Sequence, residues 1–330
     1  MKILITGSEG FIGSHLVEKL ISKGAKINAF VQYNSFNHFG WLDTLTKDKL
    51  KKIEIFTGDV RDPNSVFDAV KKSDVIINLA ALIGIPYSYK SPKSYIDTNI
   101  LGIFNILEAA KNLNIKKIIH TSTSEIYGSA KFIPITESHP VNTQSPYSAS
   151  KASADQIAMS YFYSYKLPVT ILRPFNTYGP RQSMRAVIPT IICQILNSKK
   201  INLGNLKPTR DFTYVSDTVD AFEKALKSKK TLGEVINIGS NFEVSIDEVL
   251  KTIIKISNKK ISLHKDHNRV RPQNSEVNRL VCSNLKAKKI LKWKPRYAGK
   301  KGFKEGIKKT FDWFSQKQNL NYYKINLYNL

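Results

Sequence analysis

The sequence predicts an α/β fold: a doubly wound parallel sheet joined to a smaller, discontinuous α/β domain. The chain begins with a short apolar segment, 1–6, which is followed at once by Gly7, Gly10 and Gly13, spaced three apart. Apolar segments of strand length then alternate with segments of helix length as far as Pro174, as parallel α/β sheets require. Beyond Pro174 this alternation stops, which indicates a second domain.

The individual elements follow from the apolar periodicity. The expected strands are 1–6, 27–31, 53–57, 75–79, 117–121 and 169–173. The expected helices are 14–22, 63–71, 92–112 and 146–165. This alternation favours the Rossmann arrangement, with helices on both faces of the sheet.

Two domains are expected, and both are discontinuous in sequence. The first combines 1–175 with 213–240, where the strand and helix pattern returns. The second combines 176–212 with 241–330, which contain loops, short helices and isolated strands.

The composition favours a cytoplasmic protein without nucleic-acid or membrane partners. No apolar run reaches the roughly 18 residues of a membrane span, and no signal-peptide pattern precedes the first strand. Cys193 and Cys282 are too few for a disulfide framework. The formal net charge is +25, but the basic residues are scattered instead of clustering with aromatic residues, as nucleic-acid sites require. No metal site is expected.

The glycine segment predicts a dinucleotide site. Gly7, Gly10 and Gly13 permit a tight turn, close approach of the backbone to a pyrophosphate, and close packing of a helix on a strand. Phosphates would then lie at the N-terminus of the following helix.

A tyrosine and a lysine four residues apart indicate the reaction. Tyr147 and Lys151 share one face of the expected helix 146–165. A neighbouring ammonium group favours the phenolate, so the pKa of Tyr147 is expected to fall below its usual value of about 10. The phenolate would accept a proton from an alcohol.

Three polar residues follow the expected strand 117–121, where that strand leaves the sheet. They are Thr123, Ser124 and Glu125. A carboxylate is unnecessary for oxidising an alcohol, so Glu125 implies a second chemical step.

In combination, these motifs resemble those of the extended short-chain dehydrogenase/reductases that act on nucleotide sugars. The resemblance extends to about residue 295 and rests on Gly7, Gly10, Gly13, Asp59, the segment 78–81, Asn99, the segment 121–125, Tyr147, Lys151 and the segment 173–180. It implies a dinucleotide-binding first domain and a nucleotide-sugar-binding second domain. It also implies a tightly bound NADP or NAD that is regenerated in each turnover.

The resemblance implies a set of cofactor-binding residues. They are Gly7, Gly10, Phe11, Ile12, Gly13, Gln32, Asn34, Asp59, Val60, Leu79, Ala80, Ala81, Asn99, Thr121, Tyr147 and Lys151. The second strand lacks the acid that usually binds both ribose hydroxyls of NAD. The stretch 31–37 is similar to one in GDP-mannose 4,6-dehydratases, which use NADP, although Gln32 and Tyr33 stand in place of basic residues. This favours NADP by a small margin.

The resemblance also implies the catalytic residues Thr123, Ser124, Glu125, Tyr147 and Lys151. Tyr147 would deprotonate a sugar C4 hydroxyl while hydride leaves C4, and Glu125 would remove the C5 proton so that the C6 hydroxyl leaves as water. Thr-Ser-Glu at 123–125 is similar to GDP-mannose dehydratases, whereas 4-epimerases carry Ser-Ser-Ala. UDP-glucuronate decarboxylases also carry Thr-Ser-Glu, so a decarboxylase or a 4-epimerase remains the alternative. A regulator that only binds the cofactor would usually lack the Tyr147/Lys151 pair.

Substrate contacts are implied for Asn176, Arg185, Asn205, Arg210, Arg271 and Glu276. The planar fork of arginine matches the oxygens of a pyrophosphate. An ion pair of Arg210 with Asp211 or Asp217 is the alternative. The segments 33–43, 181–190 and 204–212 are most similar to those of the GDP-N-acetylglucosamine 4,6-dehydratases of legionaminic acid synthesis, which implies that substrate.

A homodimer is expected from the helical patterns. The helix 146–165 carries apolar residues on more than one face, among them Ala154, Ile157 and Tyr161. A helix that is apolar beyond one stripe needs a second partner. The helices 92–112 and 146–165 are therefore the expected dimer interface.

Overall fold

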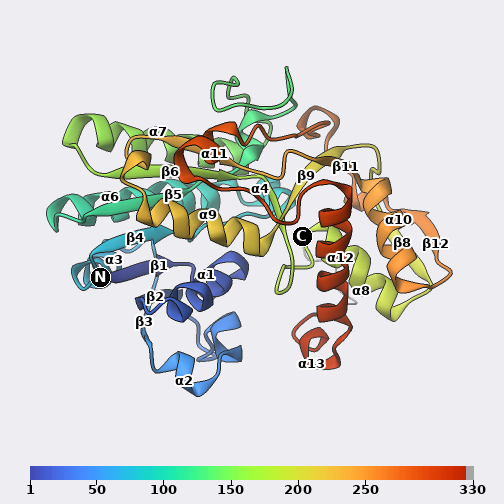
Figure 1. The fold of residues 1–330 in the computed structure, drawn as a ribbon, viewed down its shortest axis with the longest axis horizontal. Helices are drawn as coiled ribbons and strands as arrows, with labels where there is room; N and C mark the ends of the chain where they lie inside the picture. The colour runs from blue at the N-terminus through green and yellow to red at the C-terminus, as the bar shows by residue number, and fades with distance from the viewer. Residues whose placement is uncertain (325–330) are drawn as a thin grey trace.

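The computed structural model describes residues 1–324 and contains a seven-stranded parallel sheet with the strand order β10-β6-β5-β4-β1-β2-β3 (Figure 1). Its strands are β1 (Lys2–Thr6), β2 (Lys26–Gln32), β3 (Ile53–Gly58), β4 (Val75–Asn78), β5 (Lys117–Thr121), β6 (Val169–Pro174) and β10 (Val235–Ile238). The predicted doubly wound parallel sheet is confirmed. The strand order reverses between β1 and β4, and open α/β sheets bind ligands at such a reversal.

Helices cover both faces of the sheet. One face packs against α3 (Pro63–Lys71), α6 (Gly102–Asn112) and α7 (Pro146–Tyr165), and the other against α1 (Phe11–Ser22) and α9 (Val215–Lys227). Side chains of a strand alternate between the faces, so Ile3 and Ile5 belong to the core beneath α1, whereas Leu4 belongs to the core beneath α6. Within residues 1–324, no helix combines the length and the apolarity needed to cross a membrane.

A smaller region lies to one side of the large sheet (Figure 1). It holds the strands β7 (Asn176–Tyr178), β8 (Lys200–Leu203), β9 (Thr209–Tyr214), β11 (Glu243–Ser245) and β12 (Ser262–Lys265), in two sheets ordered β11-β9-β7 and β12-β8. Its helices are α8 (Val187–Asn197), α10 (Ile246–Ser257), α12 (Gly299–Ser315) and α13 (Lys317–Leu320), whereas α11 (Leu285–Leu291) packs against β10. The predicted domain boundaries stay a prediction, and positions 325–330 of the second domain lie outside the described residues.

Two predicted helices differ from the observed ones. The first begins at Phe11 instead of residue 14, because Gly10 is its N-cap. The predicted helix 92–112 is divided into α5 (Pro92–Tyr95), a π-helical turn (Ile96–Leu101) and α6. The wider π turn contains the buried Asn99, whose side chain bonds a neighbouring loop, and such turns often accompany functional sites. Short helices α2 (Lys47–Leu50) and α4 (Ile85–Lys90) complete the first part of the chain.

The start of α7 is fixed by its capping residues. The Ser145 side chain accepts a hydrogen bond from the Ser148 backbone N–H, and Pro146 occupies the first helical position. Serine at the N-cap and proline at N1 are both favoured, because they satisfy or remove unpaired backbone donors. The helix therefore begins just before Tyr147.

A buried polar network joins α7 to the central strands. Asp155 on α7 accepts hydrogen bonds from Ser122 Oγ (2.8 Å) and Arg173 Nε (3.0 Å). Arg173 also donates to the Tyr127 hydroxyl (2.8 Å), which in turn donates to Asn237 Oδ1 (2.8 Å). Asp155 and Arg173 are 1% and 5% exposed, so neither charge is solvated by water.

Replacing one partner of this network is expected to destabilise the protein strongly. In Arg173→Met the Asp155 carboxylate loses its buried counter-ion, which typically costs about 3–5 kcal/mol. Lys308→Met is the matched control, because Lys308 pairs with Asp312 on the exposed side of α12 and such pairs contribute about 0–1 kcal/mol. Urea denaturation followed by circular dichroism measures both variants. Equal, small losses of stability in the two variants would contradict the expectation.

Candidate active site

A cavity of about 660 Å³ lies at the carboxyl edge of the large sheet and extends toward α8 and β8. Its walls come from the β1–α1 loop, from the ends of β2 to β6, and from the segments 203–212 and 269–276. Every predicted site residue except Asn34 and Asn99 lines it. Residues that are more than 250 positions apart in the sequence therefore line the same cavity.

Asn34 and Asn99 do not line the cavity and instead stabilise nearby loops. Asn34 donates to the His38 backbone carbonyl (2.8 Å) and stabilises the loop after β2. Asn99 is 2% exposed; it accepts from the Leu82 N–H (2.9 Å) and donates to Ser150 Oγ (2.9 Å). Asn99 therefore fixes the cavity wall at Leu82 against α7 instead of lining the cavity itself.

The glycine loop has the shape that a dinucleotide pyrophosphate requires. Gly7 adopts φ +65°, and a Cβ at Gly13 would lie 2.2 Å from the Gly7 carbonyl oxygen, so α1 packs against the loop only with glycine there. Gly10 is the N-cap of α1 and has no side chain that could accept hydrogen bonds from the first N–H groups of the helix. These N–H groups therefore lie beside the cavity without a side-chain partner. Uncapped N–H groups at a helix N-terminus favour an anion such as phosphate.

The loop after β4 is held close to this turn. Thr6 Oγ1 donates to Asn78 Oδ1 (2.6 Å) and accepts from the N–H groups of Leu79 (3.2 Å) and Ala80 (3.1 Å). A Cβ at Gly7 would lie 3.0 Å from the Ala80 backbone. The predicted cofactor residues of the β1–α1 and β4 loops therefore form one rigid surface.

Tyr147 and Lys151 lie together on α7, as expected, but their pKa values differ from the prediction. Burial raises the pKa of Tyr147, although a hydrogen bond with Thr123 acts in the opposite direction. Burial lowers the pKa of Lys151 to about 8, and its ammonium group donates to the Thr121 carbonyl (2.6 Å). The predicted fall of the tyrosine pKa is therefore wrong for this structure, because desolvation of the phenolate outweighs its neighbours.

Glu125 belongs to a cluster of alternating charges in the cavity. Its carboxylate lies 3.8 Å from Arg271 Nη1, which lies 3.9 Å from Glu276 Oε1. Arg210 Nη2 lies 3.6 Å from the same Glu276 oxygen. The Arg271 Nη1 atom is buried without a hydrogen-bond partner among the described residues, which leaves it available to an anion.

The alternative partners of Arg210 are otherwise engaged. Asp211 accepts from the backbone N–H groups of Ser240 (2.7 Å) and Asn241 (2.8 Å), and burial raises its pKa to about 6. Asp217 accepts from the Tyr297 N–H (2.8 Å). Arg210 therefore faces the cavity cluster instead of a structural aspartate.

The remaining predicted substrate residues line the same cavity. Asn176 has a buried side-chain oxygen without a hydrogen-bond partner in residues 1–324. Arg185 Nε donates a long hydrogen bond to Ser183 Oγ (3.3 Å), and Asn205 accepts from the Lys207 N–H (3.1 Å). All three thus retain polar atoms for a bound molecule.

Several lining residues were not expected from the sequence. They include Glu9, Arg61, Thr98, Gln182, Ser183, Arg269 and the segment 82–86. Most carry no local pattern that marks a site. Glu9 is the exception, because it stands inside the glycine motif, directly before Gly10.

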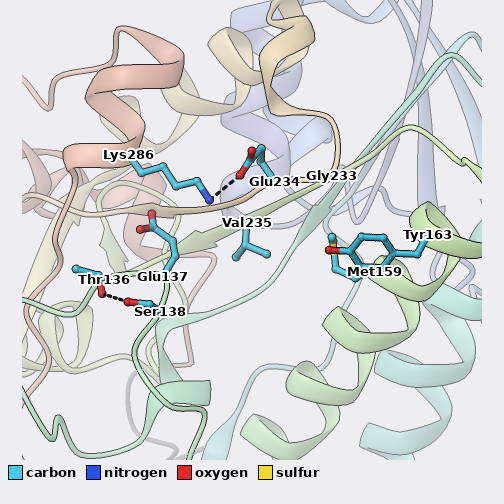
Figure 2. A pocket seen from close by; sticks show the side chains of 9 residues that line it. All are labelled: Thr136, Glu137, Ser138, Met159, Tyr163, Gly233, Glu234, Val235 and Lys286. Carbon is cyan, nitrogen blue, oxygen red and sulfur yellow. Dashed lines mark hydrogen bonds and ion pairs between the residues drawn. The ribbon is translucent and has the colours of Figure 1, made fainter.

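A second hollow lies away from this cavity, between α7, β10 and α11, and contains none of the predicted site residues (Figure 2). Its walls are formed by Thr136, Glu137, Ser138, Met159, Tyr163, Gly233, Glu234, Val235 and Lys286. Lys286 pairs with Glu234 (2.7 Å), and the Glu137 carboxylate accepts from the Asn237 N–H (2.8 Å). These charges satisfy one another or the backbone, so the hollow offers a ligand little.

Comparisons with known proteins relate this chain to nucleotide-sugar 4,6-dehydratases and to a nucleotide-sugar 4-epimerase. Residues 4–310 match the family described as GDP-mannose 4,6 dehydratase. The chain is 34% identical to a dTDP-D-glucose 4,6-dehydratase of Dictyostelium discoideum, over 99% of this chain and 83% of the relative. Among solved structures, a dTDP-glucose 4,6-dehydratase of Bacillus anthracis in complex with NAD is 31% identical, with a TM-score of 0.83 over 96% of this chain and 97% of that one. A UDP-glucuronic acid 4-epimerase of Bacillus cereus, bound to UDP-glucuronic acid and NAD, is 29% identical, with a TM-score of 0.85 over 96% and 99%.

Proposed function

The chain belongs to the GDP-mannose 4,6-dehydratase family, and we propose that it converts a nucleoside-diphosphate hexose into the 4-keto-6-deoxy sugar and water. The proposal rests on one observation above all: Glu125 shares a cavity with the Tyr147/Lys151 pair. The pair alone serves alcohol oxidation, and the added carboxylate serves an elimination.

The first step is oxidation at C4. Tyr147 accepts the proton of the C4 hydroxyl, and Thr123 hydrogen-bonds the Tyr147 phenol and holds that hydroxyl. Lys151 lines the same wall of the cavity, and its ammonium form would favour the phenolate during this transfer. The glycine loop of residues Gly7, Gly10 and Gly13 would hold a nicotinamide dinucleotide, which would supply the hydride acceptor for C4 and the hydride donor for C6.

The second step is loss of water. The C4 ketone acidifies the C5 hydrogen, and Glu125 removes it as a proton. Glu125, with Ser124 beside it, delivers that proton to the departing C6 hydroxyl. The hydride removed from C4 would then return to C6, C5 would take up a proton from solvent, and Tyr147 would release to solvent the proton that it accepted. The product then differs from the substrate by one water, with no net oxidation.

A mass measurement distinguishes this function from its alternatives. The protein is incubated with a panel of nucleotide sugars, and each product is weighed by mass spectrometry. Loss of water supports a dehydratase. Loss of carbon dioxide would identify a decarboxylase, and a change of stereochemistry at constant mass would identify an epimerase, the activity named for the Bacillus cereus neighbour.

The proposed substrate is GDP-N-acetylglucosamine, with the product serving legionaminic acid synthesis. Similarity of the segments 33–43, 181–190 and 204–212 to enzymes of that class supports it. The cationic groups of Arg185, Arg210 and Arg271 line the cavity and suit a diphosphate. Asn176, Asn205 and Glu276 would orient the rest of the nucleotide sugar.

The proposal includes a cytoplasmic homodimer with a dinucleotide-binding domain (1–175 and 213–240) and a nucleotide-sugar-binding domain (176–212 and 241–330). Free, buried cysteines at 193 and 282 suit a reducing compartment. Ile96, Leu101 and Phe104 are between 42% and 49% exposed, which supports an interface beside α6.

Two substitutions are expected to stop the reaction at different steps. Tyr147→Phe should abolish reduction of the cofactor, because no group then accepts the C4 proton. Glu125→Gln should leave C4 oxidation intact and slow both C5 exchange and water loss by about 10²–10⁴-fold, as expected for loss of an acid/base group. Cofactor absorbance reports the first step, and solvent deuterium at C5 reports the second. Wild-type deuterium incorporation by Glu125→Gln would remove Glu125 from the mechanism.

The nucleotide base is expected to be recognised as guanine. GDP should then inhibit much more strongly than UDP or dTDP, because polar groups arranged for a purine edge are left unpaired by a pyrimidine. Inhibition constants measured with one common substrate provide the comparison. A preference for UDP, or equal inhibition by all three, would refute the GDP assignment and leave the dehydratase assignment intact.

The protein is expected to be a dimer at micromolar concentration. Light scattering should give twice the mass of the 37.4 kDa chain, and the double variant Leu101→Glu/Phe104→Glu should give monomers, because each charge would be buried in the interface. Phe36→Glu is the control, since Phe36 is 83% exposed on the loop after β2. A monomeric wild-type protein would contradict the expectation.

A further inference from the structure

The end of β2 lacks an acid of its own, but a carboxylate reaches it from the glycine loop. Strand β2 ends at Gln32, and the Glu9 Oε1 atom accepts a hydrogen bond from the Gln32 backbone N–H (2.9 Å). Both residues line the cavity. In Rossmann sites the acid after the second strand hydrogen-bonds the adenosine ribose hydroxyls, so Glu9 brings the missing functional group to that place.

The second oxygen of this carboxylate is left without a partner. Glu9 Oε2 is buried and makes no hydrogen bond with any described residue. Burial also raises the pKa of Glu9, while the bond from Gln32 opposes the shift. A buried carboxylate oxygen without a donor is costly, so a ligand that supplies a hydroxyl donor there would be stabilising.

The surrounding loop holds Glu9 in position. The Trp41 N–H donates to the Glu9 carbonyl (3.0 Å), and a Cβ at Gly40 would lie 2.8 Å from that carbonyl oxygen. The neighbouring cation, Arg61, donates through Nε and Nη2 to the Asp59 carboxylate. Among the described residues of the β1–α1 loop and of the ends of β2 and β3 that line the cavity, Arg61 is the sole cation, and it is already paired.

We propose that Glu9 makes this enzyme select NAD over NADP, by accepting hydrogen bonds from the adenosine ribose and by repelling a 2′-phosphate. The inference rests on the proposed function, since it assumes that the cavity holds a nicotinamide dinucleotide. This proposal reverses the small preference for NADP that the sequence after β2 indicates. The acid that selects the cofactor is Glu9, which comes from the loop between β1 and α1. The 2′-phosphate of NADP would lie close to the Glu9 carboxylate and would be repelled by it, because Arg61, the cation nearby, is already paired with Asp59.

A binding experiment that does not depend on turnover tests the role of Glu9. The purified protein is equilibrated with an excess of an equal mixture of NAD and NADP, freed of unbound nucleotide and denatured, and the released nucleotides are quantified by chromatography. The wild-type protein should retain NAD over NADP by about tenfold or more, and Glu9→Gln should reduce this ratio by about tenfold or more, the usual effect of losing a charged hydrogen-bond partner. Glu9→Asp, which keeps the charge, should still favour NAD.

Glu54→Gln is the matched control. It removes an exposed carboxylate from β3 that pairs with Lys72 and does not line the cavity, so the wild-type ratio should persist. A wild-type ratio of one or less, or an unchanged ratio in Glu9→Gln, would overturn the proposal. If Glu9→Gln does not fold, the wild-type ratio alone still decides between NAD and NADP. Failure of the proposed function would appear separately, as absent water loss in the sugar panel.

Discussion

Asp155 is the contact on which the geometry of the cavity depends. It lies one helical turn after Lys151 on α7 and binds Ser122 at the end of β5 and Arg173 on β6. These bonds fix both the height and the rotation of α7 relative to the sheet. Tyr147 and Lys151 are carried on the same helix, so a charge pair that never touches a substrate sets the position of the proposed base. A buried pair of this kind adds little net stability against an apolar replacement, yet it is costly to break.

The proposed acid/base residues of the cavity come from two separate elements. Tyr147 and Lys151 belong to α7 and lie in a desolvated wall, whereas Glu125 belongs to the turn after β5 and shares its surroundings with Arg271. Burial disfavours the charged forms of Tyr147 and Lys151. Glu125, in contrast, lies among charged side chains. The two parts of the cavity therefore differ in their electrostatic surroundings, one desolvated and the other charged.

The sequence predicted the parts of the site that local spacing determines. Gly7 to Gly13, and the pair Tyr147 and Lys151, are set by neighbouring residues, and they lie as expected. The pKa of Tyr147 could not be predicted from spacing, because it depends on burial by the whole fold. Likewise, the contact of Arg210 with Glu276 joins β9 to a segment far along the chain. The π turn around Asn99 was not predicted either, because the hydrogen bond between Asn99 and Leu82 joins two different segments of the fold.

If Arg271 binds the substrate as proposed, it also contacts the proposed base. It lies 3.8 Å from Glu125 and 3.9 Å from Glu276, so one guanidinium already serves two carboxylates. A diphosphate bound to Arg271 would compete for the same cation and weaken its hold on Glu125. A single guanidinium would thus position both the proposed substrate diphosphate and the proposed base.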